Sequence, residues 1–594
     1  MGVVPDLPAQ GRPLWSSDLV LSLLYKATFL VVLLLVFMPL SALIYGSLRT
    51  TAPGQPGGEW TLVNYANLAS SGVLTTIWTT LWIGLVASAL CIIIGTALAL
   101  IVHRTDFRWP RTLTVLIGLA FYFPSFIVAM AWIIIGAPGG IINAMLRDGL
   151  GLEWIEFDIY NAWGIIYITI LHQVPFVYLT IRGPIIHMDA TYEEAARTAG
   201  ATPAKVMRRV TLPLLGYSIA SSFIPVFVLS IEKFAVPALI GIPGQVTMLA
   251  TQLYLLVRFS PVDYGLAAAI CLALSAITGA AIWAQRRITQ AGRLTTVTGK
   301  AGRVKPIKLG KWRWAANVFC FGFIVLALLL PMFILLYTSV LRWFIANPFN
   351  GIYTWRNYIF MWESASTWSS FWNTLLVSGI GAAIGVALGL LCSYFTLRLK
   401  PAGHSALDFI TVLPFGVPGI VIGLGLLWAY AYLPIPLYGT LAVIIIAFVT
   451  RFLPYAVETV GGQMVQIDRS LEEAAWVAGA TRLSAARRIM LPLVAPSVQG
   501  AYFLLFMAFF REISAAILLY AADTKVISVS IWAFFEQANW GQASALSVAA
   551  TLIIFMSLLV IGWLVPTGRR FWKEAWGGYL NCQSRTTLWR GARN

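Results

Sequence analysis

Two pairs of charged residues interrupt apolar stretches at corresponding places in the sequence. The first pair is Glu232-Lys233, and the second is Arg511-Glu512. A charge inside a membrane-spanning segment is costly and usually functional. We expect each acid to lie in the outer part of the membrane near a cleft, where the two acids help to form a gate or its supporting ion pairs. The alternative is that both acids face the outer interface and anchor helix ends.

The residue types that most often perform catalysis show no recognisable arrangement. The chain has four histidines and five cysteines, and no Cys/His or Ser/His/Asp constellation stands out. No cysteine pair has metal-ligand spacing, so we predict neither a disulfide nor a metal site. Between Gly292 and Gly299-Lys300-Ala301, more residues separate the glycines than a phosphate-binding loop allows, and Ala replaces its Ser or Thr. We therefore expect this chain not to hydrolyse ATP.

The charged residues are carried by long apolar runs. Hydrophobic residues make up 59% of the 594 residues and charged residues only 11%, which is too apolar for a soluble protein. A spanning helix needs about 20 mostly apolar residues, and helices pair their own backbone groups in lipid. The twelve expected spans lie near residues 27–48, 77–102, 112–136, 160–182, 217–242, 265–285, 314–340, 371–397, 406–430, 436–459, 496–521 and 544–566.

Positive charge gathers in alternate loops. The net charge is +17, and Lys or Arg clusters follow the second, fourth, sixth, tenth and twelfth spans. Cytoplasmic loops carry this excess, so we expect both termini in the cytoplasm, and we attribute the charge to topology and membrane lipid rather than to nucleic acid. The first apolar run is longer than the apolar region of a signal peptide, and we expect it to remain as the first helix.

The chain contains an internal repeat. Residues 193–215 and 472–494 are identical at 13 of 23 positions, and each copy is a polar loop between apolar runs. Pro124 and Pro418 correspond in the third span of each half. An even number of spans per half gives both copies the same orientation, which is a parallel repeat. The predicted fold is an all-α membrane protein with twelve transmembrane helices in two parallel pseudo-symmetric six-helix halves.

The repeat also sets the expected domain boundaries. The predicted parts are a first half at 1–285 with a loop at 189–215, a basic cytoplasmic linker at 286–313, a second half at 314–566 with a loop at 468–494, and a cytoplasmic tail at 567–594. The outer loop 137–159 is longer than its counterpart 431–435 and is the main asymmetry between the halves.

Each repeated loop is expected to form two short helices joined by a bend. Thr191-x-x-Glu194 and Ser470-x-x-Glu473 fit capping boxes that would begin the first helix. Gly200 and Gly479 suit a left-handed helix end. These features predict the same backbone path in both loops.

The second short helix should be capped by Thr202 in one loop and Thr481 in the other. The pairs Arg208-Arg209 and Arg487-Arg488 fall near its C-terminal end, which favours cations. The Leu-Pro dipeptide that follows in each loop is expected to break the helix before the membrane.

This pattern resembles the EAA signature loop of inner-membrane permeases of ATP-binding-cassette (ABC) importers. The matching residues are Glu194, Ala195, Ala196, Gly200, Val210, Leu212 and Pro213 in the first copy, and Glu473, Ala474, Ala475, Gly479, Ile489, Leu491 and Pro492 in the second. Val210 in place of Ile is the only departure. The resemblance implies a type I importer permease with two halves fused in one chain, in the bacterial inner membrane.

The resemblance also implies partners. Each loop would be a coupling helix that docks on one of two copies of a cytoplasmic ATPase, which uses ATP and Mg²⁺, while a periplasmic solute-binding protein delivers the substrate. No cofactor would be bound by this chain. The alternative is that Glu194 and Glu473 only cap helices, and that the arginine pairs only set topology by touching phospholipid.

The substrate signal is weaker. The ends of the fifth and eleventh spans, at 230–241 and 510–519, together with the fusion of two halves, resemble permeases for ferric iron. Related permeases carry 2-aminoethylphosphonate, thiamine or polyamines. A protein of another class, an ion-driven secondary transporter, could also have twelve spans in two halves. Such a transporter would not need two matching cytoplasmic docking loops.

Overall fold

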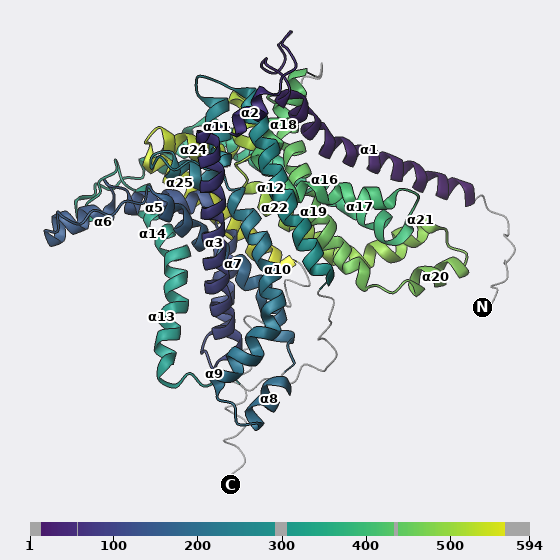
Figure 1. Ribbon diagram of the computed structural model, residues 1–594, viewed down its shortest axis with the longest axis horizontal. Coiled ribbons are helices and arrows are strands. Elements are labelled where there is room, and N and C mark those ends of the chain that lie inside the picture. The colour runs from purple at the N-terminus through teal and green to yellow at the C-terminus, as the bar shows by residue number, and fades with distance from the viewer. Residues whose placement is uncertain (1–13, 56, 190, 292–305, 433–436, 565–594) are drawn as a thin grey trace.

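The computed structural model describes residues 14–55, 57–189, 191–291, 306–432 and 437–564. The expected tail at 567–594 and residues 292–305 of the expected linker at 286–313 lie outside these residues. Within the described ranges the chain is helical, and its only β-type pairs are isolated bridges. Figure 1 shows the long helices and the short connecting helices around them.

The long helices repeat in the same order in the two halves. In the first half they are α1 (Leu14–Ser47), α3 (Ser71–Arg104), α4 (Pro110–Tyr122), α5 (Ser125–Gly136), α7 (Ala162–His187), α10 (Leu212–Ile231) and α12 (Tyr264–Ala291). In the second half they are α13 (Arg313–Ile324), α14 (Leu330–Ser339), α16 (Ala365–Tyr394), α17 (His404–Val412), α18 (Gly419–Tyr432), α19 (Leu441–Gln466), α22 (Leu491–Phe510) and α25 (Trp540–Leu564).

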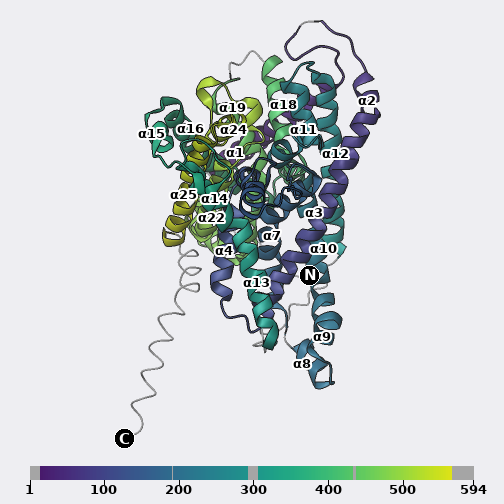
Figure 2. The same ribbon diagram turned by 90° about the vertical axis from the view of Figure 1, so that its left-hand side faces the viewer.

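Short helices join these elements. They are α2 (Val63–Leu68), α6 (Ile141–Ala144), α8 (Thr191–Thr198), α9 (Pro203–Val206), α11 (Leu249–Arg258), α15 (Arg356–Glu363), α20 (Ser470–Val477), α21 (Arg482–Ala485), α23 (Ala516–Leu519) and α24 (Ile527–Glu536). In both views, α8 and α9 lie at one end of the molecule and α2 and α11 at the other (Figures 1 and 2).

The expected all-α fold with about twelve spans is confirmed. Among the described residues, eleven helical segments are long and apolar enough to cross a membrane, and the number rises to twelve if a bent pair counts as one span. That pair is His404–Gly416 with Gly419–Ala431, which meet at 109°. Pro418 lies at this bend, and Pro124 separates α4 from α5 at the corresponding place. The continuous helices expected at these two places are wrong, because proline lacks the N–H that a helix interior requires.

Two other expected spans end earlier than predicted. The fifth and eleventh runs stop being helical after Ile231 and Phe510, so Glu232 and Glu512 lie just beyond the helix ends and not inside the helices. In the second half, the Glu512 carboxylate accepts a hydrogen bond from the Ser514 N–H at 2.8 Å. A side-chain acceptor of this kind offers the backbone an alternative to the helical pattern.

The first helix of each half packs on the other half. α1 runs beside α17 and α18, whereas α13 and α14 pack against α4 and α5 (Figures 1 and 2). Each arm also packs on its own half, α1 against α12 and α14 against α25. The Trp132 indole N–H donates to the Leu326 carbonyl at 3.3 Å, and the Thr450 hydroxyl donates to the Leu35 carbonyl at 3.3 Å. We refer to α1 and α13–α14 as the exchanged arms.

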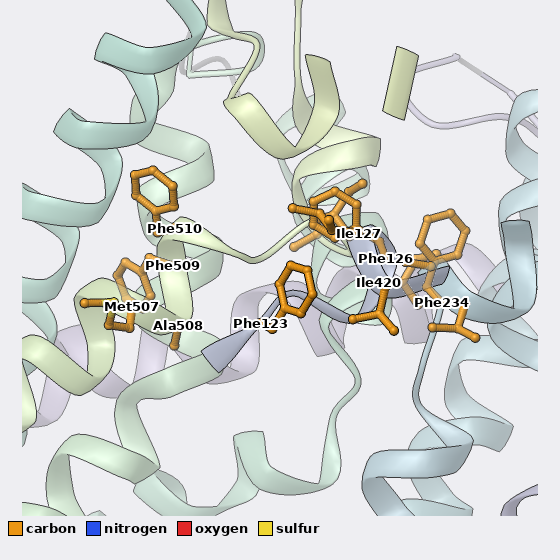
Figure 3. Packing of buried hydrophobic residues seen from close by; sticks show 14 of the residues in the cluster. Phe123, Phe126, Ile127, Phe234, Ile420, Met507, Ala508, Phe509 and Phe510 are labelled. Carbon is orange, nitrogen blue, oxygen red and sulfur yellow. The ribbon is translucent and has the colours of Figure 1, made fainter. Parts of the chain in front are cut away.

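A buried apolar cluster joins the halves where α10 and α22 end. In Figure 3, Met507, Ala508, Phe509 and Phe510 lie on one side, Phe126, Ile127, Phe234 and Ile420 lie on the other, and Phe123 stands between them. Because this cluster takes side chains from both halves, it fixes the ends of α10 and α22 close together around the site described next.

Candidate coupling loops and a charged cavity between the halves

The two repeated loops bend in the same way. α8 and α20 each end at a glycine with a left-handed backbone, Gly200 at φ +81° and Gly479 at φ +83°. In both loops the N–H after the glycine donates to the carbonyl five residues earlier, at 3.0 and 2.9 Å. A Cβ at either position would meet nothing within 4 Å. Glycine is therefore required by the backbone conformation and not by crowding.

The predicted capping boxes are wrong. Thr191 and Ser470 are the first helical residues and not the N-caps. The Asp189 carboxylate accepts from the Thr191 N–H at 2.9 Å, and the Asp468 carboxylate accepts from the Ser470 N–H at 2.9 Å. An aspartate reaches the N–H two residues ahead in an Asx turn, so the preceding acid takes the capping role.

The caps predicted for the second short helices are confirmed. The Thr202 hydroxyl accepts from the Lys205 N–H at 3.4 Å, and the Thr481 hydroxyl accepts from the Ser484 N–H at 3.2 Å. These caps begin α9 and α21, so both loops contain two helices separated by the glycine bend.

The predicted helix break at each Leu-Pro dipeptide is wrong. A π-helical turn at Met207–Thr211 or Ala486–Met490 carries each arginine pair, and α10 or α22 then begins at the leucine. Each loop thus continues into one helical span, Pro203–Ile231 or Arg482–Phe510. In each span the π-helical turn directly precedes the Leu-Pro dipeptide. A proline is accommodated there because such a turn already interrupts the regular hydrogen-bond pattern of the α-helix.

Most of the predicted coupling residues are on the surface. The exposed ones are Glu194, Ala195, Gly200, Arg208, Arg209, Glu473, Ala474, Gly479, Arg487 and Arg488, whereas Ala196 and Ala475 are half-buried. Each loop has two adjacent glutamates. The second of them is exposed, whereas the first, Glu193 or Glu472, is buried. Sequence reasoning missed this pair of buried acids.

Glu193 is held by three side chains. Its carboxylate lies 3.7 Å from Arg104 Nη1 and 3.8 Å from Arg197 Nη2, and it accepts a hydrogen bond from the Thr211 hydroxyl at 2.7 Å. Arg104 is the last residue of α3, and its Nη2 donates to the Ile185 carbonyl at 2.9 Å. The buried arginine therefore fastens α8 to the ends of α3 and α7.

Glu472 has fewer partners. Its carboxylate lies 3.5 Å from Arg398 Nη1, and Arg398 also donates to the Met464 and Ile467 carbonyls. Burial raises the pKa of the Glu472 carboxyl above its ordinary value, although Arg398 and Arg469 act in the opposite direction. Ionised Glu472 therefore costs the fold some stability, and this cost grows as pH rises through the raised pKa.

A charged cavity of about 330 Å³ lies between the halves beyond the ends of α10 and α22. Its polar lining comes from both halves: His172, Gln173, Glu232 and Lys233 from the first, and Arg451, Tyr455, Arg511, Glu512 and Ser514 from the second. All four residues predicted for a gate thus line one cavity.

Glu232 is not paired with its neighbour in the sequence. Its carboxylate forms an ion pair and hydrogen bond with Arg451 of the other half, and Arg451 also donates to the Val417 carbonyl. Lys233 instead places its Nζ 3.4 Å from His172 Nδ1. The structure therefore pairs charges across the halves, and sequence reasoning missed Arg451.

Arg511 also reaches across to the first half. Its Nη1 donates to the Phe121 carbonyl at 2.7 Å, and its guanidinium lies 5.2 Å and 5.9 Å from the ring centroids of Phe121 and Tyr122. These are cation–π distances. Glu512, next to it, takes the Ser514 N–H described above.

A second cavity of about 640 Å³ adjoins the first, with Gln285, Glu458 and Thr459 in its lining. Glu232 and Arg451 line both cavities. Because α19 runs from Arg451 through Glu458 toward α20, the second cavity is nearer to the repeated loops, and we call it the loop-end cavity. The Glu232–Arg451 pair lies in the wall between the two.

The described residues include no cluster of three or more His, Cys, Asp or Glu placed to hold a metal ion. The cavity is instead lined by single acids, arginines, a lysine and aromatic rings. A polar cavity between two repeated, many-spanning halves is the arrangement found in membrane transport proteins.

Comparison with known families identifies this transport protein more closely. Residues 92–291 and 385–570 match the family "Binding-protein-dependent transport system inner membrane component", once in each half. The chain belongs to this family. It is a multi-pass inner-membrane permease of the ABC importer type, with two permease halves fused in one chain.

Individual relatives agree with this membership. The chain is 26% identical to the ferric transport system permease protein FbpB of Actinobacillus pleuropneumoniae, across 80% of this chain and 69% of the relative. It is 27% identical to a putative ferric transport system permease protein FbpB 1 of Haemophilus influenzae, across 78% and 73%. A putative 2-aminoethylphosphonate transport system permease protein PhnV of Salmonella choleraesuis is 26% identical, across 43% of this chain and 96% of the relative.

Proposed function

We propose that the two repeated loops dock two copies of a cytoplasmic ATPase, which uses ATP and Mg²⁺ to drive import through this chain. The observation that carries the proposal is the pair of surface loops with the same glycine bend and the same caps. The docking residues would be Glu194, Ala195, Ala196, Gly200, Arg208, Arg209, Glu473, Ala474, Ala475, Gly479, Arg487 and Arg488. Two equivalent surfaces suit two copies of one partner.

Exposed apolar side chains on the loops support a protein partner. Tyr192 is 51% exposed on α8, while Leu471 and Val477 are 47% and 85% exposed on α20. Grouped apolar residues at a surface favour burial against another protein. In this arrangement the side of the molecule that carries the two repeated loops is cytoplasmic, and both termini lie on that side. The opposite side receives a periplasmic solute-binding protein.

The Glu232–Arg451 pair would form part of the gate. It connects the two halves in the wall between the charged cavity and the loop-end cavity. ATP-driven closure of the ATPases would move the halves as rigid bodies and separate these two residues. Lys233, Arg511 and Glu512 would line the gate on the side away from the loops.

Ferric iron is the proposed cargo, because three relatives that align over most of this chain are described as ferric permeases. A second candidate is 2-aminoethylphosphonate. The cationic side chains of the charged cavity favour it, since they complement a phosphonate. Both candidates need the same partners, so the partners can be tested first.

The test is purification of the detergent-solubilised chain, followed by mass spectrometry of the proteins that remain bound. We expect an ATPase subunit with the wild-type chain and its loss from the double variant Gly200→Val/Gly479→Val, because valine resists the left-handed backbone. Gly462→Val is the matched control, since Gly462 is exposed and has neither a positive φ nor a close neighbour. A chain that binds no ATPase and transports in vesicles without ATP would instead be an ion-driven transporter.

A further inference from the structure

The charged cavity has an uneven charge balance. Arg451 and Glu232 neutralise each other through their ion pair. Lys233 and Arg511 then face a single acid, Glu512, and neither cation forms an ion pair in the part of the chain that the structure describes. Two cations in a largely apolar enclosure between two membrane-embedded halves favour an anion.

Gln173 also lines the charged cavity. Gln173 is only 2% exposed, and its Oε1 accepts from the Ser230 hydroxyl at 3.3 Å, but its Nε2 has no hydrogen-bond partner among the described residues. A buried donor without a partner is costly, and a ligand oxygen would satisfy it. Gln173 and Lys233 come from the first half and Arg511 comes from the second, so such a ligand would contact both halves.

We propose that Lys233, Arg511 and Gln173 form a binding site for a small oxyanion within the transport path. This inference rests on the proposed function as a permease, and it narrows the class of cargo. The group recognised would be a phosphate, phosphonate or carboxylate. It would arrive either as a free molecule or as a ligand already bound to ferric iron.

The chemistry of the cavity is unsuited to bare ferric iron. A hard trivalent cation seeks several oxygen ligands, and the described residues hold no cluster of three or more candidate ligands. Lys233 and Arg511 would also repel it. Iron that crosses here therefore travels with its own anionic ligands, whose oxygens accept charge-assisted hydrogen bonds from the lysine and arginine.

Binding can be measured by calorimetry on the full chain in lipid nanodiscs, with inorganic phosphate, 2-aminoethylphosphonate, citrate and ferric citrate as separate probes. We expect saturable binding of at least one probe. Binding of phosphate, phosphonate or citrate without iron assigns a free oxyanion, whereas binding of ferric citrate alone assigns an iron-borne one. Absence of saturable binding by all four probes overturns the proposal.

Variants locate the site. Lys233→Met/Arg511→Met should weaken binding at least tenfold, and Gln173→Leu should weaken it several-fold. Lys233→Arg should retain most of the affinity, because arginine keeps the positive charge. If Lys233 only packed against its neighbours, keeping the charge would not be expected to preserve binding. Arg147→Met is the control, because it removes an exposed arginine outside the cavity. Unchanged affinity in the double variant would overturn the assignment.

The same preparations separate this inference from the proposed function. If the ATPase co-purifies but no probe binds, the oxyanion site is wrong and the permease assignment stands. If neither the ATPase nor any probe binds, both are overturned. Thermal unfolding of each variant, compared with the wild-type chain, identifies any variant that fails to fold.

Discussion

The two repeated loops share a backbone but hold their buried acids differently. Glu193 is surrounded by Arg104, Arg197 and the Thr211 hydroxyl, whereas Glu472 has Arg398 as its one close ion-pair partner among the described residues. Both loops have the same glycine bend and the same type of threonine cap. The two copies therefore share the backbone geometry of the loop but differ in the side chains that bind its buried glutamate.

The charged cavity shows the same pattern. His172 and Arg451 occupy corresponding positions, three residues before Pro175 in α7 and Pro454 in α19. Arg451 is a permanent cation and pairs with Glu232 of the other half, while His172 lies beside Lys233 of its own half. At this place in the charged cavity, the described residues thus form one ion pair across the halves, Glu232 with Arg451, where strict symmetry would give two.

Replacing the buried arginines should produce the largest difference in stability between the two loops. Arg398→Met leaves Glu472 without its close partner, and loss of one member of a buried pair costs about 3–5 kcal/mol. Arg104→Met should cost less, because Glu193 keeps Arg197 and Thr211. Hydrogen exchange of the α20 and α8 amides would measure both effects. Equal or larger loosening of α8 would contradict the comparison, and Arg487→Met serves as an exposed control.

Thr211→Val should remove one of the interactions that hold Glu193, and so make α8 less stable. The residue at the corresponding place in the second loop is Met490, which has no hydroxyl. A hydrogen bond to a charged group contributes about 1.5–3 kcal/mol, so protection of α8 should fall toward that of α20. A Thr211→Ser variant should retain the protection; if it did not, the methyl group and not the hydroxyl would be responsible.

Replacing the glycine of either bend with alanine should destabilise the two loops equally. Gly200→Ala and Gly479→Ala each place a side chain in a left-handed conformation, which costs about 1–2 kcal/mol. Because a Cβ meets nothing at either position, crowding adds no difference between the loops. Amide exchange should show the same loosening in both loops, and a clear inequality would mean that the bends are not equivalent.

The smallest effect should come from transplanting a charge. Trp476 stands where the first loop has Arg197, four residues after the buried acid. Trp476→Arg should add a helical ion pair with Glu472 worth about 0.3–0.5 kcal/mol. A slight increase in α20 protection that disappears at high salt is expected, and Trp476→Gln is the uncharged control. A salt-independent gain would point to something other than the ion pair.

Sequence reasoning predicted the parts of this molecule that depend on local pattern. Apolar runs gave the spans, and glycine and threonine spacing gave the bends and caps. The capping boxes failed because an aspartate two residues before each helix competes for the same N–H. The fifth and eleventh spans end early, at Ile231 and Phe510, and in the eleventh the Glu512 carboxylate binds the Ser514 N–H in place of a helical hydrogen bond.

Contacts between distant residues were beyond local pattern. Lys233 stood next to Glu232 in the sequence, yet the partner is Arg451, 219 residues away. An arginine inside an expected span was a usable signal for this site. The basic cluster after the second span, to which Arg104 belongs, was assigned to topology alone. Two signals could have shown more: Arg398 recurs at the equivalent helix end, and each loop has two adjacent glutamates that such an arginine could bind.

The exchanged arms have a consequence for how the protein assembles. α1 is synthesised first, but two of its packing partners, α17 and α18 of the other half, emerge from the ribosome only after most of the chain has been made. The first half therefore cannot complete its folding as an independent unit, and α1 waits in the bilayer with one face uncovered. Maturation of both halves becomes a single late event, so a truncated nascent chain would be left as an unfinished substrate for membrane quality control.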